Sequence, residues 1–88
     1  MNSIFLKING MSILTVNKSY IALNLDFING SMIVNIEDGQ QISVPLEWFP
    51  KLRDASHEQL MNYRFIGGGE GIHWEALDED LLVENLFL

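Results

Sequence analysis

Three turn-forming dipeptides, Asn9-Gly10, Asn29-Gly30 and Asp38-Gly39, divide the first half of the chain into short segments. Asn-Gly and Asp-Gly favour two-residue hairpin turns, because such turns need residues that tolerate positive φ angles. The segments between them alternate apolar and polar residues, most clearly over residues 20–27, which is the period of a half-buried strand. The sequence therefore predicts an antiparallel β-meander with one apolar face that other elements must cover.

The apolar positions of this meander define the predicted core face of each strand. Residues 11–16 are apolar without clear alternation, so the register of that segment stays open. In the other strands the residues expected to face the core are Ile4, Leu6, Ile8, Ile21, Leu23, Leu25, Phe27, Met32, Val34, Ile36, Ile42, Val44 and Leu46.

A short helix is predicted directly after the meander. Pro45 tends to end the last strand, because proline has no N–H to donate to a ladder. Residues 47–54 are expected to be helical, with Pro50 in the first turn, where its missing N–H costs little. Trp48 and Leu52 are four residues apart, so they are expected to share the face that packs on the sheet.

A second short helix is predicted to begin at Ser56. Ser56 and Gln59 form a capping box, in which each side chain bonds to the other residue's backbone N–H. The predicted fold class is therefore α+β, an antiparallel β-meander of about four to five strands covered by two or three short helices.

The last third of the chain mixes short apolar segments with acidic ones. Residues 64–66 and 72–74 are expected to be brief extended segments, joined by the glycine-rich loop 67–71. Asp78-Glu79-Asp80 fits the start of a third helix, because acids complement the positive end of the helix dipole. The apolar residues expected to dock this helix on the core are Leu81, Leu82 and Leu86.

The charge of the chain is uneven along its length. With 88 residues and 48% hydrophobic side chains, residues 1–88 are predicted to form a single small domain. The net charge is −7, of which −1 falls on residues 1–46 and −6 on the rest, with no basic residue after Arg64. Such a surface disfavours direct nucleic-acid binding. It favours either a basic protein partner or simple solubility.

Composition also bears on redox chemistry and location. The chain has no cysteine, which excludes disulfides, thiolate metal sites and a cysteine nucleophile. The first residues lack the apolar region of a signal peptide. No apolar run approaches the roughly 20 residues that span a bilayer. We therefore expect a cytoplasmic protein that does not insert into a membrane.

Several chemically active side chains also have a simpler structural interpretation. His73, Asp78 and Asp80 could ligate a hard cation, but an acidic helix cap beside a histidine explains the same residues. The glycine-rich loop lacks a phosphate-binding lysine and carries Glu70 instead. His57 or His73 could pair with a carboxylate for acid–base chemistry, yet no nucleophile motif accompanies them. The sequence therefore predicts no enzyme, no catalytic residue, no metal and no cofactor.

The two tryptophans are candidate interface anchors, because tryptophan is enriched at binding hot spots. Trp48 is expected in the core, since it stands in the predicted helix beside apolar residues. Trp74 precedes the acidic run and is the better candidate for partial exposure.

A set of motifs in the second half resembles a known family. The motifs are Asp38-Gly39, Ile42-Ser43-Val44-Pro45-Leu46, Trp48-Phe49-Pro50, Gly71-Ile72-His73-Trp74 and Leu77-Asp78-Glu79-Asp80-Leu81. Together they are similar to the small bacterial family catalogued as domain of unknown function 2442, over about residues 20–86, with the N-terminal hairpin 1–16 outside. The resemblance implies a small α+β domain without established catalytic activity. It also implies gene neighbourhoods that look like toxin–antitoxin pairs.

These observations predict a non-catalytic protein-binding module, an antitoxin-like or inhibitor protein that docks a basic and possibly co-encoded partner through an acidic C-terminal surface. In this hypothesis Trp74 anchors the partner, while five acids steer its approach. The predicted steering residues are Glu75, Asp78, Glu79, Asp80 and Glu84.

Three alternatives stay open. The first is an acidic nucleic-acid mimic, for example a phage-encoded inhibitor of a defence nuclease. The second is a small metal-binding protein or enzyme. The third is a homodimer that forms through exposed strand edges.

Overall fold

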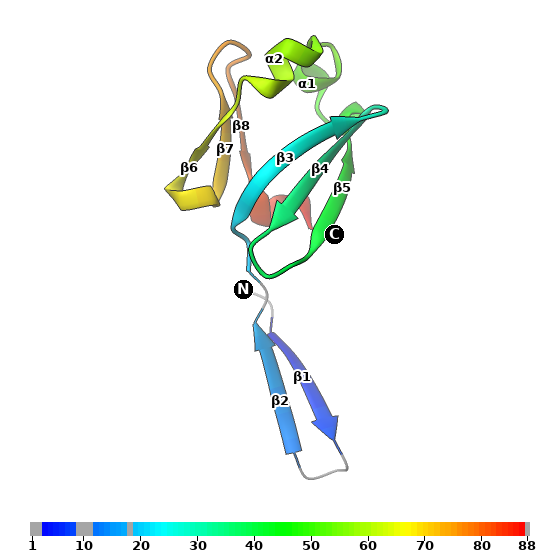
Figure 1. Cartoon of the computed structure of the whole chain (residues 1–88), viewed down its shortest axis with the longest axis vertical. Helices are drawn as coiled ribbons and strands as arrows, with labels where there is room; N and C mark the ends of the chain where they lie inside the picture. The colour runs from blue at the N-terminus through cyan, green and yellow to red at the C-terminus, as the bar shows by residue number, and fades with distance from the viewer. Residues whose placement is uncertain (1–2, 9–11, 18, 88) are drawn as a thin grey trace.

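The structure, a computed structural model, describes residues 3–8, 12–17 and 19–87 and consists of a hairpin and two three-stranded antiparallel sheets (Figure 1). The hairpin pairs β1 with β2, the first sheet has the order β3-β4-β5, and the second has the order β6-β7-β8. The strands are β1 (Ser3–Ile8), β2 (Ser12–Asn17), β3 (Ala22–Ile28), β4 (Ser31–Ile36), β5 (Gln41–Pro45), β6 (Arg64–Ile66), β7 (Gly71–Trp74) and β8 (Glu79–Leu82).

The helical elements are all short. They are the α-helices α1 (Pro50–Arg53) and α2 (His57–Met61), and the 3₁₀ turns η1 (Leu46–Trp48), η2 (Gly67–Gly69) and η3 (Val83–Leu86). The fold is therefore mostly β, and α+β only in a loose sense. None of the helices in the described ranges is long and apolar enough to cross a membrane.

The first sheet contains the later strands of the predicted meander, β3, β4 and β5. Asn29 and Gly30 both have positive φ, at 50° and 78°, as a tight hairpin turn between β3 and β4 requires. Met32, Val34 and Ile36 of β4 are buried, and β5 pairs alongside, which confirms the predicted core face of both strands. The turn predicted at Asn9-Gly10 lies outside the described residues, but the pairing of β1 with β2 confirms the first hairpin.

The alternation predicted for β3 fails at one residue. Ala22 pairs with Ile36 and Asn24 pairs with Asn35, so Leu23 is an extra residue without a cross-strand partner. This β-bulge reverses the faces on its N-terminal side. As a result Ala22 is buried and Leu23 is 59% exposed, and the prediction that Leu23 faces the core is wrong.

A single meander is also wrong, because β1 and β2 pair only with each other and the last third forms a second three-stranded sheet. Asp78-Glu79-Asp80 does not start a helix: Asp78 has a φ of 51° in a turn, and Glu79 and Asp80 open β8. Pairing with β7 supplies the backbone hydrogen bonds that a helix would otherwise have supplied. The predicted extended segment 72–74 belongs to β7, the central strand of the second sheet.

The helices between the sheets follow their local signals. Pro50 opens α1 as predicted. The capping box of α2 is complete, with Gln59 N–H donating to Ser56 Oγ at 3.1 Å and Ser56 N–H donating to Gln59 Oε1 at 2.9 Å. Trp48 and Leu52, however, do not share a helical face, because extended Phe49 separates η1 from α1.

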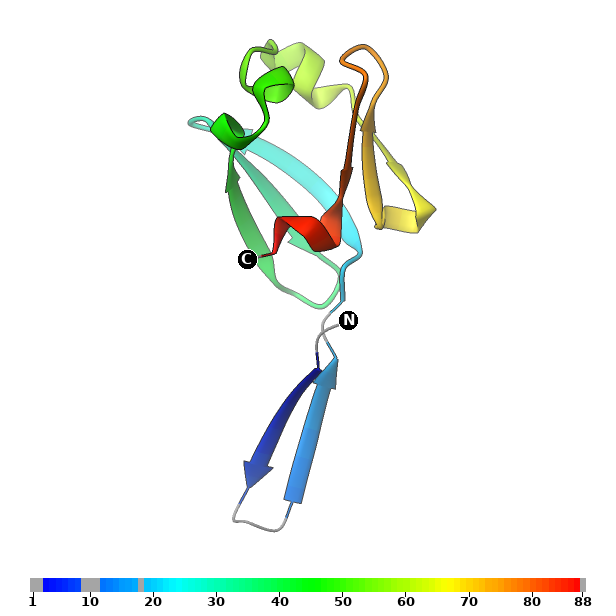
Figure 2. The same cartoon turned by 180° about the vertical axis from the view of Figure 1, so that it is seen from behind.

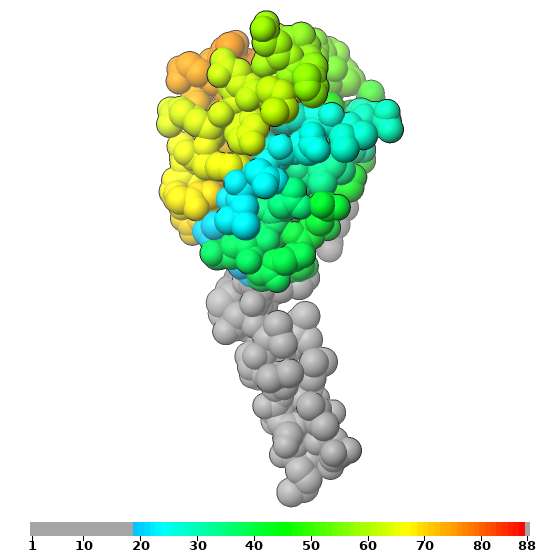
Figure 3. All heavy atoms as spheres, in the orientation of Figure 1, coloured from blue at the N-terminus to red at the C-terminus, as the bar shows by residue number. Residues whose placement is uncertain are grey.

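The core lies where the two sheets meet beneath α1 and α2. Its largest fully buried side chains are Trp74, Met32, Leu52, Ile72, Val34, Val44 and Val83. In Figure 2, η3 (red) lies in front of the first sheet, and in Figure 3 the surfaces of β3 and β6 adjoin. Val83 and Leu86 of η3 are buried, whereas Leu82, predicted to dock on the core, is 52% exposed.

Candidate functional site

One row of polar side chains crosses the outer face of the second sheet. Arg64, His73 and Asp80 are cross-strand neighbours on β6, β7 and β8. Ile72 and Trp74, on either side of His73 in β7, are buried, so the alternation of the strand places His73 on the opposite, outer face. The topology therefore gathers a base, a histidine and an acid that are separated in sequence.

Both ring nitrogens of His73 contact carboxylates. Its Nδ1 contacts Asp80 Oδ1, and its Nε2 lies 3.1 Å from Glu75 Oε1. A neutral imidazole has only one N–H, so it cannot donate to both acids, whereas the imidazolium can. The hydrogen bonds to Asp80 and then Glu75 raise the pKa of His73 above its ordinary value. Arg64, whose Nη2 is 3.9 Å from the Glu75 carboxylate, works weakly against this.

This cluster does not assemble the candidate metal site of His73, Asp78 and Asp80. The two carboxylates bound by His73 contact opposite edges of the ring, so they do not converge on one cation. Asp78 lies in the turn before β8, where its carbonyl oxygen accepts from Lys51 Nζ at 2.8 Å. Across the described residues there is no group of three or more His, Cys, Asp or Glu side chains arranged to hold a metal ion.

The two tryptophans have exchanged their predicted environments. Trp74 is fully buried, and its indole N–H donates to the Leu60 carbonyl at 3.0 Å. The prediction that it is the partly exposed tryptophan is wrong, and in this structure its side chain is not at the surface to anchor a partner. Trp48 is 49% exposed rather than in the core, because η1 ends at this residue and turns it outward.

The five predicted steering acids do not form one surface. Glu75 and Asp80 flank His73, and Asp78 lies in the same turn region near Lys51. Glu79 is only partly exposed. Glu84 lies in η3, beyond the other end of β8. Three of the acids are therefore close to basic groups, and Glu84 is separated from them by the length of a strand.

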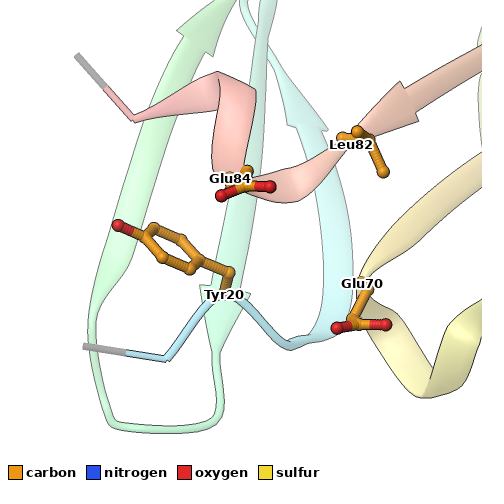
Figure 4. Close-up of a pocket in the computed structure, with 4 residues that line it drawn as sticks. All are labelled: Tyr20, Glu70, Leu82 and Glu84. Atoms are coloured by element: carbon orange, nitrogen blue, oxygen red, sulfur yellow. The ribbon is translucent and has the colours of Figure 1, made fainter. Parts of the chain in front are cut away.

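An open pocket surrounds Glu84 at that other end (Figure 4). It has a volume of about 260 Å³ and is lined by Tyr20, Glu70, Leu82 and Glu84. The Val83 N–H donates to the Glu70 carbonyl at 2.9 Å, which brings the glycine-rich loop beside the end of β8. The Tyr20 ring packs edge-on against Phe87, with centroids 5.0 Å apart. Among the described residues that line this pocket, none is basic.

Of the four described residues that line this pocket, sequence reasoning missed three. In the sequence, Glu70 stands out only as an obstacle to phosphate binding, and Tyr20 and Leu82 only as parts of a predicted strand and a predicted helix. They are 50 and 12 residues apart from Glu70, so no local motif could have joined them. His57 lines a different open pocket, of about 590 Å³, with Met61 and Ala76.

Comparisons with known proteins give a family but no activity. The family model described as protein of unknown function (DUF2442) matches residues 22–87. A solved structure of a protein of unknown function from Rhodospirillum rubrum ATCC 11170 is similar, with a TM-score of 0.67 and 32% sequence identity. The likeness covers 80% of this chain and 86% of that chain. A search of curated proteins found no match. The sequence motifs, the matched region and the shared fold show that the chain belongs to the family of unknown function DUF2442.

Proposed function

We propose that this protein is an acidic, non-catalytic binding module, antitoxin-like or inhibitory, that docks a basic segment of a partner protein. The observation that supports the proposal best is the pocket lined by Tyr20, Glu70, Leu82 and Glu84. Two carboxylates flank it, and none of its lining residues within the described part of the chain is basic. Leu82 is 52% exposed beside them, which offers apolar contact to the stem of a bound lysine or arginine.

The other acidic residues fit a secondary role in the same function. Glu75 and Asp80 already have His73 and Arg64 as neighbours, so part of their charge is compensated. Their contribution to a complex would be long-range steering, which acts mainly on the association rate and weakens with salt. Glu70 and Glu84 would instead contact the partner directly and slow its dissociation.

A charge-matched pair of variants tests this assignment. Glu70→Gln/Glu84→Gln removes the two pocket carboxylates, and Glu47→Gln/Glu58→Gln removes two exposed acids near α1 and α2. Proteins captured from the native host by the wild-type chain and by both variants are compared by quantitative mass spectrometry. The affinity of any partner captured is then measured across a salt series.

We expect the pocket variant to bind the partner about tenfold more weakly, with a shallower salt dependence, and the control to change little. Equal losses in both variants would favour a nucleic-acid mimic, which uses acids over a broad surface. Unchanged binding in the pocket variant would refute the pocket. Metal analysis of the purified protein covers the remaining alternative: a stoichiometric ion lost in Asp80→Asn would favour a metal-binding protein.

A further inference from the structure

The strand β8 forms one edge of the second sheet. In the order β6-β7-β8 it has β7 on one side and no strand of the described chain on the other. Figure 2 shows β8 in front, on the border of the sheet away from β6. An edge strand presents unpaired backbone N–H and C=O groups along its free side, and these groups can bond to a further strand.

One hydrogen bond fixes which residues of β8 turn their backbone groups to the free side. The Val83 N–H donates to the Glu70 carbonyl, which continues the pairing with β7. Backbone directions alternate along a strand, so Leu81 also faces β7, whereas Asp80 and Leu82 face away from it. Between described residues, no hydrogen bond from outside the sheet reaches the backbone of Asp80 or Leu82. Both residues are therefore open to pairing.

The side chains of this edge are exposed with the same period. The Asp80 side chain is 69% exposed, Leu82 is 52% exposed, and Glu84 is exposed as well. Between them, Leu81 is half-buried and Val83 is buried. The exposed positions therefore read acid, aliphatic, acid, each two residues apart. An extended peptide has the same period of two, so its alternate side chains can meet these three positions.

Charge decides what kind of strand fits there. Figure 4 shows Leu82 at the end of β8 and Glu84 on the turn that follows, with Glu70 lining the same pocket. Opposite charges on neighbouring strands stabilise the pair, and like charges destabilise it. A second copy of this strand, paired antiparallel about Leu82, would place Asp80 against Glu84. The edge therefore disfavours its own copy and favours a basic strand.

The other sheet edges offer less. In β5, the Leu46 N–H donates to the Gly30 carbonyl on the side of β4, so the preceding Pro45 faces the free side, where it has no N–H to donate. In β3, the Leu25 N–H is already bonded to the Tyr63 hydroxyl. The strand β6 has only three residues. These differences single out β8.

We propose that β8 binds an extended segment of the partner with the pattern basic-x-apolar-x-basic, by adding it as an antiparallel strand at the edge of the second sheet. The backbone groups of Asp80 and Leu82 supply the main-chain hydrogen bonds, and the alternate side chains supply selectivity. The apolar residue packs on Leu82, and the basic residues meet Asp80 on one side and Glu84 with Glu70 on the other. This inference rests on the proposed function for its two pocket acids, and it adds the conformation and residue pattern of the basic segment.

A synthetic peptide tests the pattern on the wild-type protein. The probe is Thr-Arg-Thr-Val-Thr-Arg-Thr, blocked at both ends and labelled for fluorescence anisotropy. Its isomer Thr-Thr-Arg-Val-Arg-Thr-Thr has the same composition, but its arginines and its valine lie on opposite faces of a strand. We expect the isomer to bind about tenfold more weakly. Methylation of the valine backbone nitrogen in the first peptide should cause a similar loss, because it removes a main-chain donor.

A matched pair of variants tests the edge itself. Leu82 has a φ of −90°, close to the range of proline, and its N–H faces away from β7, so Leu82→Pro is compatible with the strand. Leu82→Val shortens the side chain but keeps the N–H. We expect Leu82→Pro to bind the alternating peptide about tenfold more weakly than Leu82→Val. Fluorescence of the buried Trp74 reports whether both variants are folded.

Amide hydrogen exchange locates the bound peptide without any variant. With the alternating peptide at ten times its dissociation constant, exchange at Asp80 and Leu82 should slow about tenfold. Exchange at Leu81 should change much less, because its N–H already faces β7. This alternation is specific to strand addition, since a peptide bound only through side chains would not protect every second amide.

Three results would overturn the inference: no binding of the alternating peptide at millimolar concentration, equal binding of its isomer, or unchanged exchange at Asp80 and Leu82. The proposed function fails separately. If Glu70→Gln/Glu84→Gln weakens the peptide while valine methylation and Leu82→Pro have no effect, strand addition is refuted and the acidic pocket stands. If the exchange pattern appears but no host partner depends on Glu70 and Glu84, the proposed function is refuted and strand addition stands.

Discussion

The two sheets have the same number of strands and the same antiparallel pairing, but they are stabilised differently. The first has strands of five to seven residues, and its buried residues are distributed over all three of them. The second has strands of three or four residues, and much of its burial falls on Ile72 and Trp74 of one strand. Short strands make few ladder bonds, so a sheet of this kind depends on a large central side chain.

Their outer faces differ as well. Across the first sheet, Asn24, Asn35 and Gln41 form a neutral row, in which Gln41 Nε2 donates to Asn35 Oδ1 at 2.7 Å and Asn35 Nδ2 donates to Asn24 Oδ1. Across the second sheet, the corresponding row contains Arg64, His73 and Asp80. Of these two faces, only the second contains ionisable groups in mutual contact, so pH should act on the two sheets unequally.

The largest effect should come from the anchor of the second sheet. Trp74→Ala removes a fully buried indole and its hydrogen bond to Leu60, and should lower the free energy of unfolding by about 4 kcal/mol. Val34→Ala, at a fully buried position in the first sheet, should cost about 2 kcal/mol. Urea titrations followed by circular dichroism measure both. Trp48→Ala is the exposed control, and equal losses for Trp74 and Val34 would contradict the comparison.

A second variant acts where the two sheets touch. Gly69 has a φ of 114°, and a Cβ there would lie 2.5 Å from the Ala22 carbonyl oxygen of β3. Gly69→Ala therefore combines backbone strain with a steric clash, and it should lower the free energy of unfolding by about 3 kcal/mol. Gly68 also has a positive φ, 70°, but a Cβ there would have no atom within 4 Å. Gly68→Ala should therefore lower the free energy of unfolding by only about 1 kcal/mol. If thermal melts show the two variants to be alike, the glycine-rich loop is not packed against β3.

A smaller loss should follow from the hydrogen bond that joins the sheets. Leu25 N–H, on the edge of the first sheet, donates to the Tyr63 hydroxyl at 3.2 Å, just before the second sheet begins. Tyr63→Phe keeps the ring and removes only this acceptor, so it should cost about 1 kcal/mol. Amide exchange at Leu25 should become faster, while exchange at the central strand β4 stays the same. An unchanged rate at Leu25 would mean that water replaces the hydroxyl.

The smallest effect should be the pH dependence of the second sheet. The folded-state pKa of His73 is raised above its unfolded value by Asp80 and Glu75. Protonated His73 therefore contributes stability that is fully present below the unfolded pKa, and this stability is lost as pH rises through the folded pKa. Denaturation midpoints measured from mildly acidic to mildly basic pH should fall by a small amount in the wild-type protein.

Asp80→Asn tests whether His73 causes this pH dependence, because Asp80 is the main cause of the raised pKa of His73. The variant should lose most of the fall in denaturation midpoint with rising pH. His57→Gln, at an exposed position on α2, should keep that fall. NMR titration of the two imidazoles would assign the effect directly. A decline that survives Asp80→Asn would place its origin outside the second sheet.

The sequence predicted the first sheet better than the second. The faces of β4 and β5 followed from alternation, and the turn at Asn29-Gly30 from its residue types. Leu23 was misplaced because a bulge is an irregularity in pairing that alternation does not reveal. The acids at 78–80 suit a helix start and an exposed strand equally well, so only pairing with β7 could decide between them.

The candidate site was predicted in part. Glu84 was named from the sequence, but its neighbours in the pocket come from three other parts of the chain. His73 and Asp80 were named together, although for a metal rather than for the hydrogen-bonded pair that they form. The row across β6, β7 and β8 requires the register of two strand pairs, which no spacing in the sequence specifies.

Some features follow from neighbouring residues alone: the Asn29-Gly30 turn, the capping box of Ser56 and Gln59, and the concentration of acids in the second half. Which tryptophan is buried, where β8 pairs and which acids share a pocket follow only from the folded chain. The two groups of features differ in how far apart in the sequence the interacting residues are. A turn or a cap is completed by adjacent backbone groups, whereas the burial of Trp74 depends on Leu60, fourteen residues away, and on the packing of both sheets around it.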